Sequence, residues 1–155
     1  MKRKERAYTL AEAIVTLTIA VVVLALIASL IAVISNITKK VQFENLCQGE
    51  YKQANDIILD YANAYSVDIY TLKQVNNNQI VMTDGVVDYE LNFNSLTGVL
   101  TAETKNYTTN AVDSITKTFS KIVNIKFTAQ DNIVLCEYIF KNYPTYTNII
   151  KFGVS

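Results

Sequence analysis

The chain has 155 residues, with 14 basic and 14 acidic side chains, no histidine and two cysteines. It therefore lacks the commonest general base and metal ligand, and its distant cysteines form no CxxC pair, so the composition argues against an enzyme and predicts no cofactor. The balanced charge argues against direct nucleic-acid binding, which needs a surface rich in lysine and arginine.

The first 34 residues combine a basic leader, a polar junction and an uncharged apolar stretch, in that order. The leader covers residues 1–7, the junction residues 8–12, and the apolar stretch the 22 residues 13–34. A secretory signal peptide instead places its cleavage site after a shorter apolar core. At about 1.5 Å per residue the stretch measures roughly 33 Å, which exceeds the ~30 Å hydrocarbon core of a bilayer. The order predicts a membrane-spanning helix.

Glu12 is the one charge that abuts the apolar stretch. A charge inside a membrane helix costs about 2.5 to 3.5 kcal/mol on insertion scales, so such residues are usually paired and functional. No lysine or arginine follows before Lys39. If the leader were removed after Ala7, Tyr8 would carry a free amine four residues before Glu12. In a bundle of such helices, the amine of one chain could meet the carboxylate of its neighbour.

At these residues the chain resembles the type IV pilin and pseudopilin superfamily, which includes competence and type II secretion subunits. Its members have a short basic leader, a small residue before the cut, an aromatic first mature residue, then Thr-Leu, and Glu at the fifth mature position. The residues in these places are Ala7, Tyr8, Thr9, Leu10 and Glu12. The resemblance implies cleavage between Ala7 and Tyr8 by a prepilin peptidase, and N-methylation of Tyr8.

The resemblance also implies assembly into a filament. The partners would be other pilin or pseudopilin subunits, contacted through the N-terminal helix with a salt bridge at Glu12. The pilus assembly machinery would build the filament, and membrane lipid would surround the helix before assembly.

The chain departs from the common pattern of the superfamily in three ways. The residue before the cut is usually Gly and is Ala7 here, and the common first mature residue Phe is replaced by Tyr8. The helix-loosening Gly and Pro of many major pilins are replaced by Val21 and Ser29. These replacements predict a straight membrane helix and favour a minor subunit or pseudopilin.

We expect three parts: a leader at 1–7, a transmembrane and filament-core helix at 8–35, and an extracytoplasmic pilin-like globular domain at 36–155. The basic leader places the N-terminus in the cytoplasm by the positive-inside rule, so the chain is a single-pass protein of the cytoplasmic membrane. Removing the leader takes four basic residues and one acidic residue from 14 of each, leaving ten and thirteen. The mature protein is mildly acidic.

Apolar residues recur at steps of three or four after the span, which is the period of one helix face. They are Phe43, Leu46, Cys47, Ala54, Ile58, Tyr61 and Tyr65. The pattern predicts that the helix continues to about Tyr65 with its second half laid along a sheet. An exposed binding stripe of tyrosines is the alternative, but the tyrosines share a face with Leu46 and Ile58, which favours core packing.

From residue 79 the apolar period changes to two, as in half-buried strands. The predicted strands are residues 79–83, 87–93, 99–102, 123–128, 133–141 and 146–154. A turn at Asp84-Gly85 joins the first two into a hairpin, and the last three form a meander. Residues 103–118 are predicted as a loop with a helical turn at 111–115, and residues 129–132 as a loop.

The predicted fold class is α+β. A long N-terminal helix, membrane-spanning in its first half and amphipathic in its second, packs on a C-terminal antiparallel β-sheet in the pilin-like manner that the resemblance implies.

Two pairs of polar residues are candidate calcium ligands: Asp84 with Asp88, and Asp131 with Asn132. Neither pair has the regular oxygen-ligand spacing of a calcium-binding loop, so we expect solvated turn residues and no metal site.

Cys47 and Cys136 are both predicted to face the interface between helix and sheet. In an oxidising compartment, a disulfide closing so long a loop would stabilise the fold by about 4 to 5 kcal/mol in the chain-entropy model. The alternative is two small buried side chains left as thiols.

The sequence thus predicts a non-enzymatic filament subunit, a minor pilin or pseudopilin. DNA uptake, protein secretion and adhesion remain open within that class. A single-pass anchored binding domain that acts as a monomer is the competing interpretation, and a surface enzyme is a weaker third.

Overall fold

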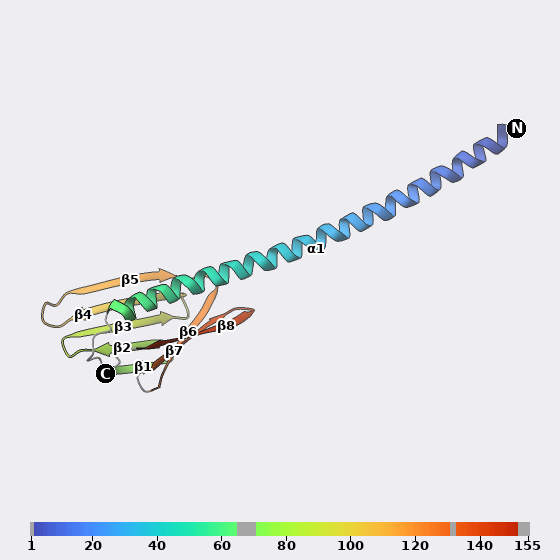
Figure 1. Cartoon of the computed structure of the whole chain (residues 1–155). Helices are drawn as coiled ribbons and strands as arrows, with labels where there is room; N and C mark the ends of the chain where they lie inside the picture. Colours follow the sequence, from blue (N-terminus) through green and yellow to red (C-terminus); the bar gives the residue numbers. More distant parts are fainter. Residues whose placement is uncertain (1, 65–70, 131–132, 152–155) are drawn as a thin grey trace. The chain divides into compact units, whose positions relative to one another are not determined.

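The computed structural model describes residues 2–64, 71–130 and 133–151, without the side chains of residues 2–8, 62–64, 71–72, 74–75, 130 and 150–151. One helix is followed by antiparallel strands (Figure 1). The elements are α1 Lys2–Ala64, β1 Thr71–Asn76, β2 Gln79–Thr83, β3 Val87–Asn94, β4 Val99–Asn106, β5 Val112–Thr118, β6 Ile122–Gln130, β7 Ile133–Phe140 and β8 Tyr143–Lys151. The predicted α+β architecture is confirmed.

The chain forms two compact units, residues 1–43 and residues 44–155. The first unit consists of the N-terminal part of α1, and the second contains the rest of α1 and all the described strands. In the second unit one face of α1 is buried: Cys47, Ala54 and Ile58 are fully enclosed, and Tyr61 is nearly so. The predicted amphipathic second half of the helix is therefore confirmed, while Tyr65 lies outside the described residues.

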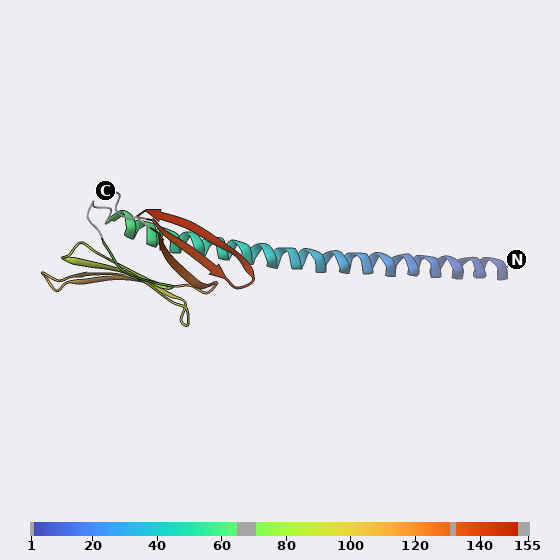
Figure 2. The ribbon, with the colours of Figure 1, turned by 90° about the horizontal axis from the view of Figure 1, so that it is seen from below.

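Two antiparallel sheets make up the rest of the second unit. The first has the strand order β1-β2-β3-β4-β5 and the second the order β6-β7-β8. Figure 2, turned by 90°, shows the first sheet edge-on along one side of the helix. A hydrogen bond ties the helix to it, from the Tyr61 hydroxyl to the backbone oxygen of Glu103 in β4 at 2.7 Å.

The predicted hairpin of β2 and β3 is confirmed. Asp84 and Gly85 form its turn, in which Gly85 has a φ of 89°, a left-handed conformation that glycine adopts without strain. The Asp84 carboxylate accepts hydrogen bonds from the backbone N–H groups of Val86 and Val87 at 2.8 and 2.7 Å. Beyond the turn, the predicted alternation of buried and more exposed side chains holds, because Tyr89, Leu91 and Phe93 of β3 are buried.

The prediction for residues 103–118 is wrong. β4 continues to Asn106, and residues 112–118 form β5 instead of a loop with a helical turn. β5 pairs with β4 through its backbone, but all seven of its side chains are exposed. It therefore has no alternation of buried and exposed residues from which a strand could be predicted. β1 also went unpredicted.

Two predicted core positions are wrong. Leu46 is 54% exposed, because it lies about 100° around the helix from the buried Cys47. Val123 is exposed whereas Ile122 is buried, because the register of β6 against β7 shifts between residues 122 and 124. The shift moves Ile122 onto the core face that Ile125 and Phe127 occupy.

The C-terminal meander is confirmed as β6-β7-β8, with changed boundaries. β6 runs through Gln130, so the predicted loop begins later, and its residues 131 and 132 lie outside the described ones. β8 begins at Tyr143 and includes Pro144, which an edge strand tolerates because no ladder hydrogen bond need be donated there. Residues 152–154 of the predicted last strand also lie outside the described residues.

Candidate functional site

The apolar segment of α1 is exposed on all sides in its unit. Val21, Val22, Val23 and Leu24 follow one another at about 100° steps around the helix, and all four are about half exposed or more. Among the described residues, α1 between Thr9 and Tyr61 is the one helix long and apolar enough to cross a membrane. A helix that is apolar all round requires a lipid or protein environment. The structure is thus compatible with a single-pass membrane anchor.

Threonine hydroxyls within the segment are satisfied by the helix itself. Thr16 donates a hydrogen bond to the backbone oxygen of Glu12 at 2.8 Å, and Thr18 donates to that of Ile14 at 2.8 Å. Such bonds to the carbonyl four residues earlier let a hydroxyl enter apolar surroundings without losing a partner. The polar atoms of these two side chains therefore do not oppose burial.

Glu12 lies on a helix face where most of the neighbouring side chains are small. A shallow hollow on this face is lined by Thr9, Glu12, Ala13, Thr16, Leu17 and Ala20. The small side chains let a second helix approach closely, beside the carboxylate. Glu12 is exposed on this face, and its pairing with another subunit stays a prediction.

The predicted processing residues directly precede Thr9 in the chain. Ala7 and Tyr8 belong to α1, but their side chains lie outside the described residues. Cleavage between them and methylation of Tyr8 stay predictions.

Glu50 is a structural residue that sequence reasoning missed. It lies three residues after Cys47, on the packed face of α1, and its carboxylate binds the connection between β5 and β6. One oxygen accepts from the backbone N–H and hydroxyl of Ser120 at 2.9 and 2.8 Å; the other accepts from the N–H groups of Lys121 and Ile122 at 2.7 and 3.1 Å. Burial raises the pKa of Glu50, but these four hydrogen bonds together outweigh it and hold the pKa below its usual value.

Asn55 is a second missed residue on α1. Its side-chain oxygen accepts hydrogen bonds from the Tyr138 hydroxyl at 3.2 Å and from the Asn148 amide at 2.5 Å. These donors lie on β7 and β8, so one side chain fixes the helix to two strands of the second sheet. A search for apolar periodicity skips such residues because they are polar.

The two cysteines are buried and both are free thiols in the structure. Their predicted burial is confirmed, and the disulfide between them stays a prediction. Burial raises the pKa of Cys136 to about 12, and burial followed by the charge of Glu50 raises the pKa of Cys47. Both thiols therefore stay protonated near neutral pH, which makes them poor nucleophiles.

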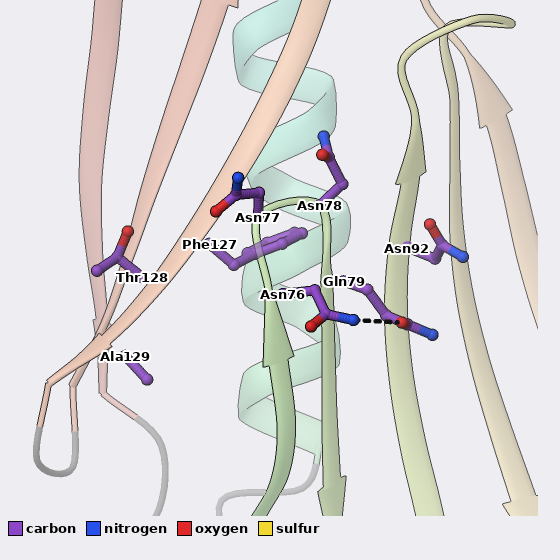
Figure 3. A pocket seen from close by; sticks show the side chains of 8 residues that line it. All are labelled: Asn76, Asn77, Asn78, Gln79, Asn92, Phe127, Thr128 and Ala129. Carbon is purple, nitrogen blue, oxygen red and sulfur yellow. Dashed lines mark hydrogen bonds between the residues drawn. The ribbon is translucent and has the colours of Figure 1, made fainter.

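An open cleft of about 820 Å³ lies beside the turn between β1 and β2 (Figure 3). It is lined by Asn76, Asn77, Asn78, Gln79, Asn92, Phe127, Thr128 and Ala129. Backbone and side-chain groups of the turn bind β3 of the same sheet and β6 of the other sheet. Asn77 and Asn78 accept backbone hydrogen bonds from Phe127 and Phe93 at 3.0 and 2.8 Å, and the Asn78 amide donates to the Ile125 carbonyl at 3.2 Å. We interpret the cleft as a structural junction.

The acidic residues weighed as calcium ligands have structural partners. Asp84 caps the hairpin turn, whereas Asp88 lies in β3, where it pairs with Lys73 at 2.7 Å and accepts from the Tyr107 hydroxyl at 2.8 Å. Asp131 and Asn132 lie outside the described residues. Within the described part of the chain, no three His, Cys, Asp or Glu side chains are grouped to hold a metal ion.

Comparison of the chain with protein-family models, with curated proteins and with solved structures finds no match.

Proposed function

We propose that this chain is a non-enzymatic structural subunit, a minor pilin or pseudopilin, of a type IV pilus-like filament. The observation that carries the proposal is the apolar segment of α1, exposed all round and preceded by Glu12. The resemblance of the residues around Ala7 and Tyr8 to a prepilin cleavage junction supports the same function. DNA uptake, protein secretion and adhesion are all compatible with it.

The proposed assembly step moves the apolar helix from lipid into a bundle of identical or related helices. The helix never faces water on this route, so no apolar surface is hydrated. Once the leader is removed, the new amine of Tyr8 carries a positive charge next to apolar surroundings. Glu12 of a neighbouring subunit neutralises it, and the pair sets the axial register of two helices that otherwise present mainly Val, Leu and Ile to each other.

Before assembly, the subunit spans the cytoplasmic membrane once, with its N-terminus in the cytoplasm and residues 36–155 outside. Four basic residues in the leader support this orientation. The partners are the prepilin peptidase, the assembly machinery and other subunits; after assembly the domain belongs to an extracytoplasmic or surface filament.

A monomeric anchored binding domain is the second candidate, because the same apolar helix would hold it in a membrane. A plain anchor, however, gains nothing from an acid at the membrane edge, where a charge is costly. The two candidates therefore differ in what they require of residues 7–12.

The mature N-terminus tests the proposal. The full chain, expressed in membranes with and without a prepilin peptidase, is purified and its intact mass measured. We expect the peptidase to remove residues 1–7 and leave a methylated Tyr8, and an Ala7→Leu variant to stay uncleaved. A chain that retains its leader with an active peptidase present, while a known prepilin in the same membranes is cleaved, would leave the plain anchor as the better account.

A further inference from the structure

β5 forms one edge of the first sheet. All seven of its side chains are exposed, and Ile115 is exposed by 61% although its partner in β4, Ala102, is buried. An uncovered edge strand presents free backbone N–H and C=O groups to any strand that can pair with it. An apolar residue at its centre adds surface that pairing would cover.

Hydrogen bonds at both ends of β5 show which backbone groups point away from β4. The N–H of Asn106 donates to the carbonyl of Ala111 at 2.9 Å, and the N–H of Phe119 donates to that of Gly98 at 2.8 Å. In an antiparallel ladder such bonded positions recur at every second residue. The odd-numbered residues of β5 therefore bond to β4, and its even-numbered residues direct their N–H and C=O groups outward.

We propose that this edge binds a second copy of the chain, with the two β5 strands antiparallel and a two-fold axis at Ile115. The sequence of β5 is complementary to itself about that residue. Asp113 then lies opposite Lys117 of the second copy, and Lys117 opposite its Asp113. Ile115 meets its own equivalent, so the exposed apolar side chain is covered.

The backbone pattern agrees with this register. The even-numbered residues, whose backbone groups point outward, face one another in the pairs 112 with 118 and 114 with 116, and so form the hydrogen bonds. Ile115 and the Asp113–Lys117 pairs fall at the non-hydrogen-bonded positions, where the Cα atoms are only ~4.5 Å apart and side chains are closest. A pairing centred on Asp113 or on Lys117 would instead place like charges opposite each other.

The pairing is independent of the filament proposed above, because it requires only two copies at high local concentration. A seven-residue strand pair buries less than the roughly 1,200 Å² of a stable protein interface. We therefore expect a weak, reversible contact, best detected at high protein concentration in detergent.

Cysteine cross-linking tests the register. The full chain with Ile115→Cys is concentrated in detergent micelles, oxidised with copper phenanthroline and analysed on non-reducing gels. The two introduced thiols would meet at a Cα separation within the ~4.4–6.8 Å range of disulfides. Ser114→Cys is the matched control, because Ser114 is equally part of the exposed edge but faces Thr116 of the second copy, beyond disulfide reach of its own equivalent. We expect Ile115→Cys to give roughly tenfold more dimer than the control.

A charge swap tests the complementarity. Adding Asp113→Lys to Ile115→Cys places like charges opposite each other and should lower the dimer yield roughly tenfold. Adding Lys117→Asp as well restores opposite charges and should restore the yield. Equal cross-linking at residues 114 and 115, or no recovery in the charge-swapped chain, would overturn the proposal.

Discussion

The two halves of α1 have different relations to their surroundings, although they form one continuous helix. Between residues 9 and 37 the large apolar side chains are exposed in every direction around the helix. From Cys47 to Tyr61 one face is buried against strands of the same chain, and the opposite face is polar. The second half is thus covered by its own domain, while the first has to be covered by something outside the chain.

The difference lies in what each half needs in order to be stable. The second half gains its free energy from burial against the sheets and from polar bonds such as those of Glu50 and Asn55. The first half has an apolar surface and one charge, Glu12. Such a helix is stable only in lipid or packed among other helices. Substitutions matched between the halves separate these roles.

The largest expected difference is between two isoleucines of the same helix. Ile58→Ala removes a fully buried side chain and should lower the unfolding free energy of the domain by about 2 to 5 kcal/mol. Ile27→Ala, in the exposed apolar segment, should leave it unchanged. Denaturant unfolding of the full chain in detergent, followed by near-UV tyrosine circular dichroism, measures both. Equal effects would mean that the halves are not independent.

A smaller effect is expected at Glu50. Glu50→Ala leaves the N–H groups of Ser120, Lys121 and Ile122 without their acceptor, which should cost about 1 to 3 kcal/mol. Asp60→Ala removes an exposed acid from the same part of α1 and should change the stability by less than about 0.5 kcal/mol. The same unfolding experiment compares the two variants. A similar loss of unfolding free energy in both would contradict the structural role of Glu50.

The smallest expected effect is a pH dependence of this contact. The pKa of Glu50 is lower in the folded protein than in the unfolded chain, so its stabilisation is fully present above the unfolded pKa of about 4.3 and is lost as the pH falls through the folded pKa. Glu50→Gln should remove this part of the acid sensitivity, because the amide does not titrate. When the unfolding free energy is measured between pH 3 and 7, the values for the wild type and for Glu50→Gln should therefore converge at low pH. Parallel curves would contradict the lowered pKa.

Much of the fold could be predicted from the sequence because burial follows a simple period in many elements. The helix face at Cys47, Ala54 and Ile58 and the hairpin at Asp84-Gly85 are examples. β5 escaped prediction because its pairing depends on the backbone and its side chains are all exposed. The burial of Ile122 could not be predicted, because the residue types do not reveal a register shift between two strands.

The polar contacts between helix and sheets could not be predicted either. Glu50 and Asn55 bind groups about 70 to 90 residues away in the chain, and nothing near them in the sequence indicates those partners. The candidate assembly residues differ in kind, because Ala7, Tyr8 and Glu12 were chosen from local order and resemblance. The roles of these residues depend on partners outside the chain, so they stay predictions.

The Glu12→Ala variant tests the central claim most directly. Its insertion and cleavage should match the wild type, since the substitution removes a charge from the membrane edge and leaves residues 7 and 8 unchanged. Assembly should fall sharply, because the amine of Tyr8 would enter apolar surroundings without its carboxylate. The measurement is the amount of the subunit recovered in sheared filaments, relative to the membrane pool, with Asp60→Ala as the control acid. We predict strong loss for Glu12→Ala alone; wild-type incorporation by a stable, correctly cleaved Glu12→Ala chain would contradict the account.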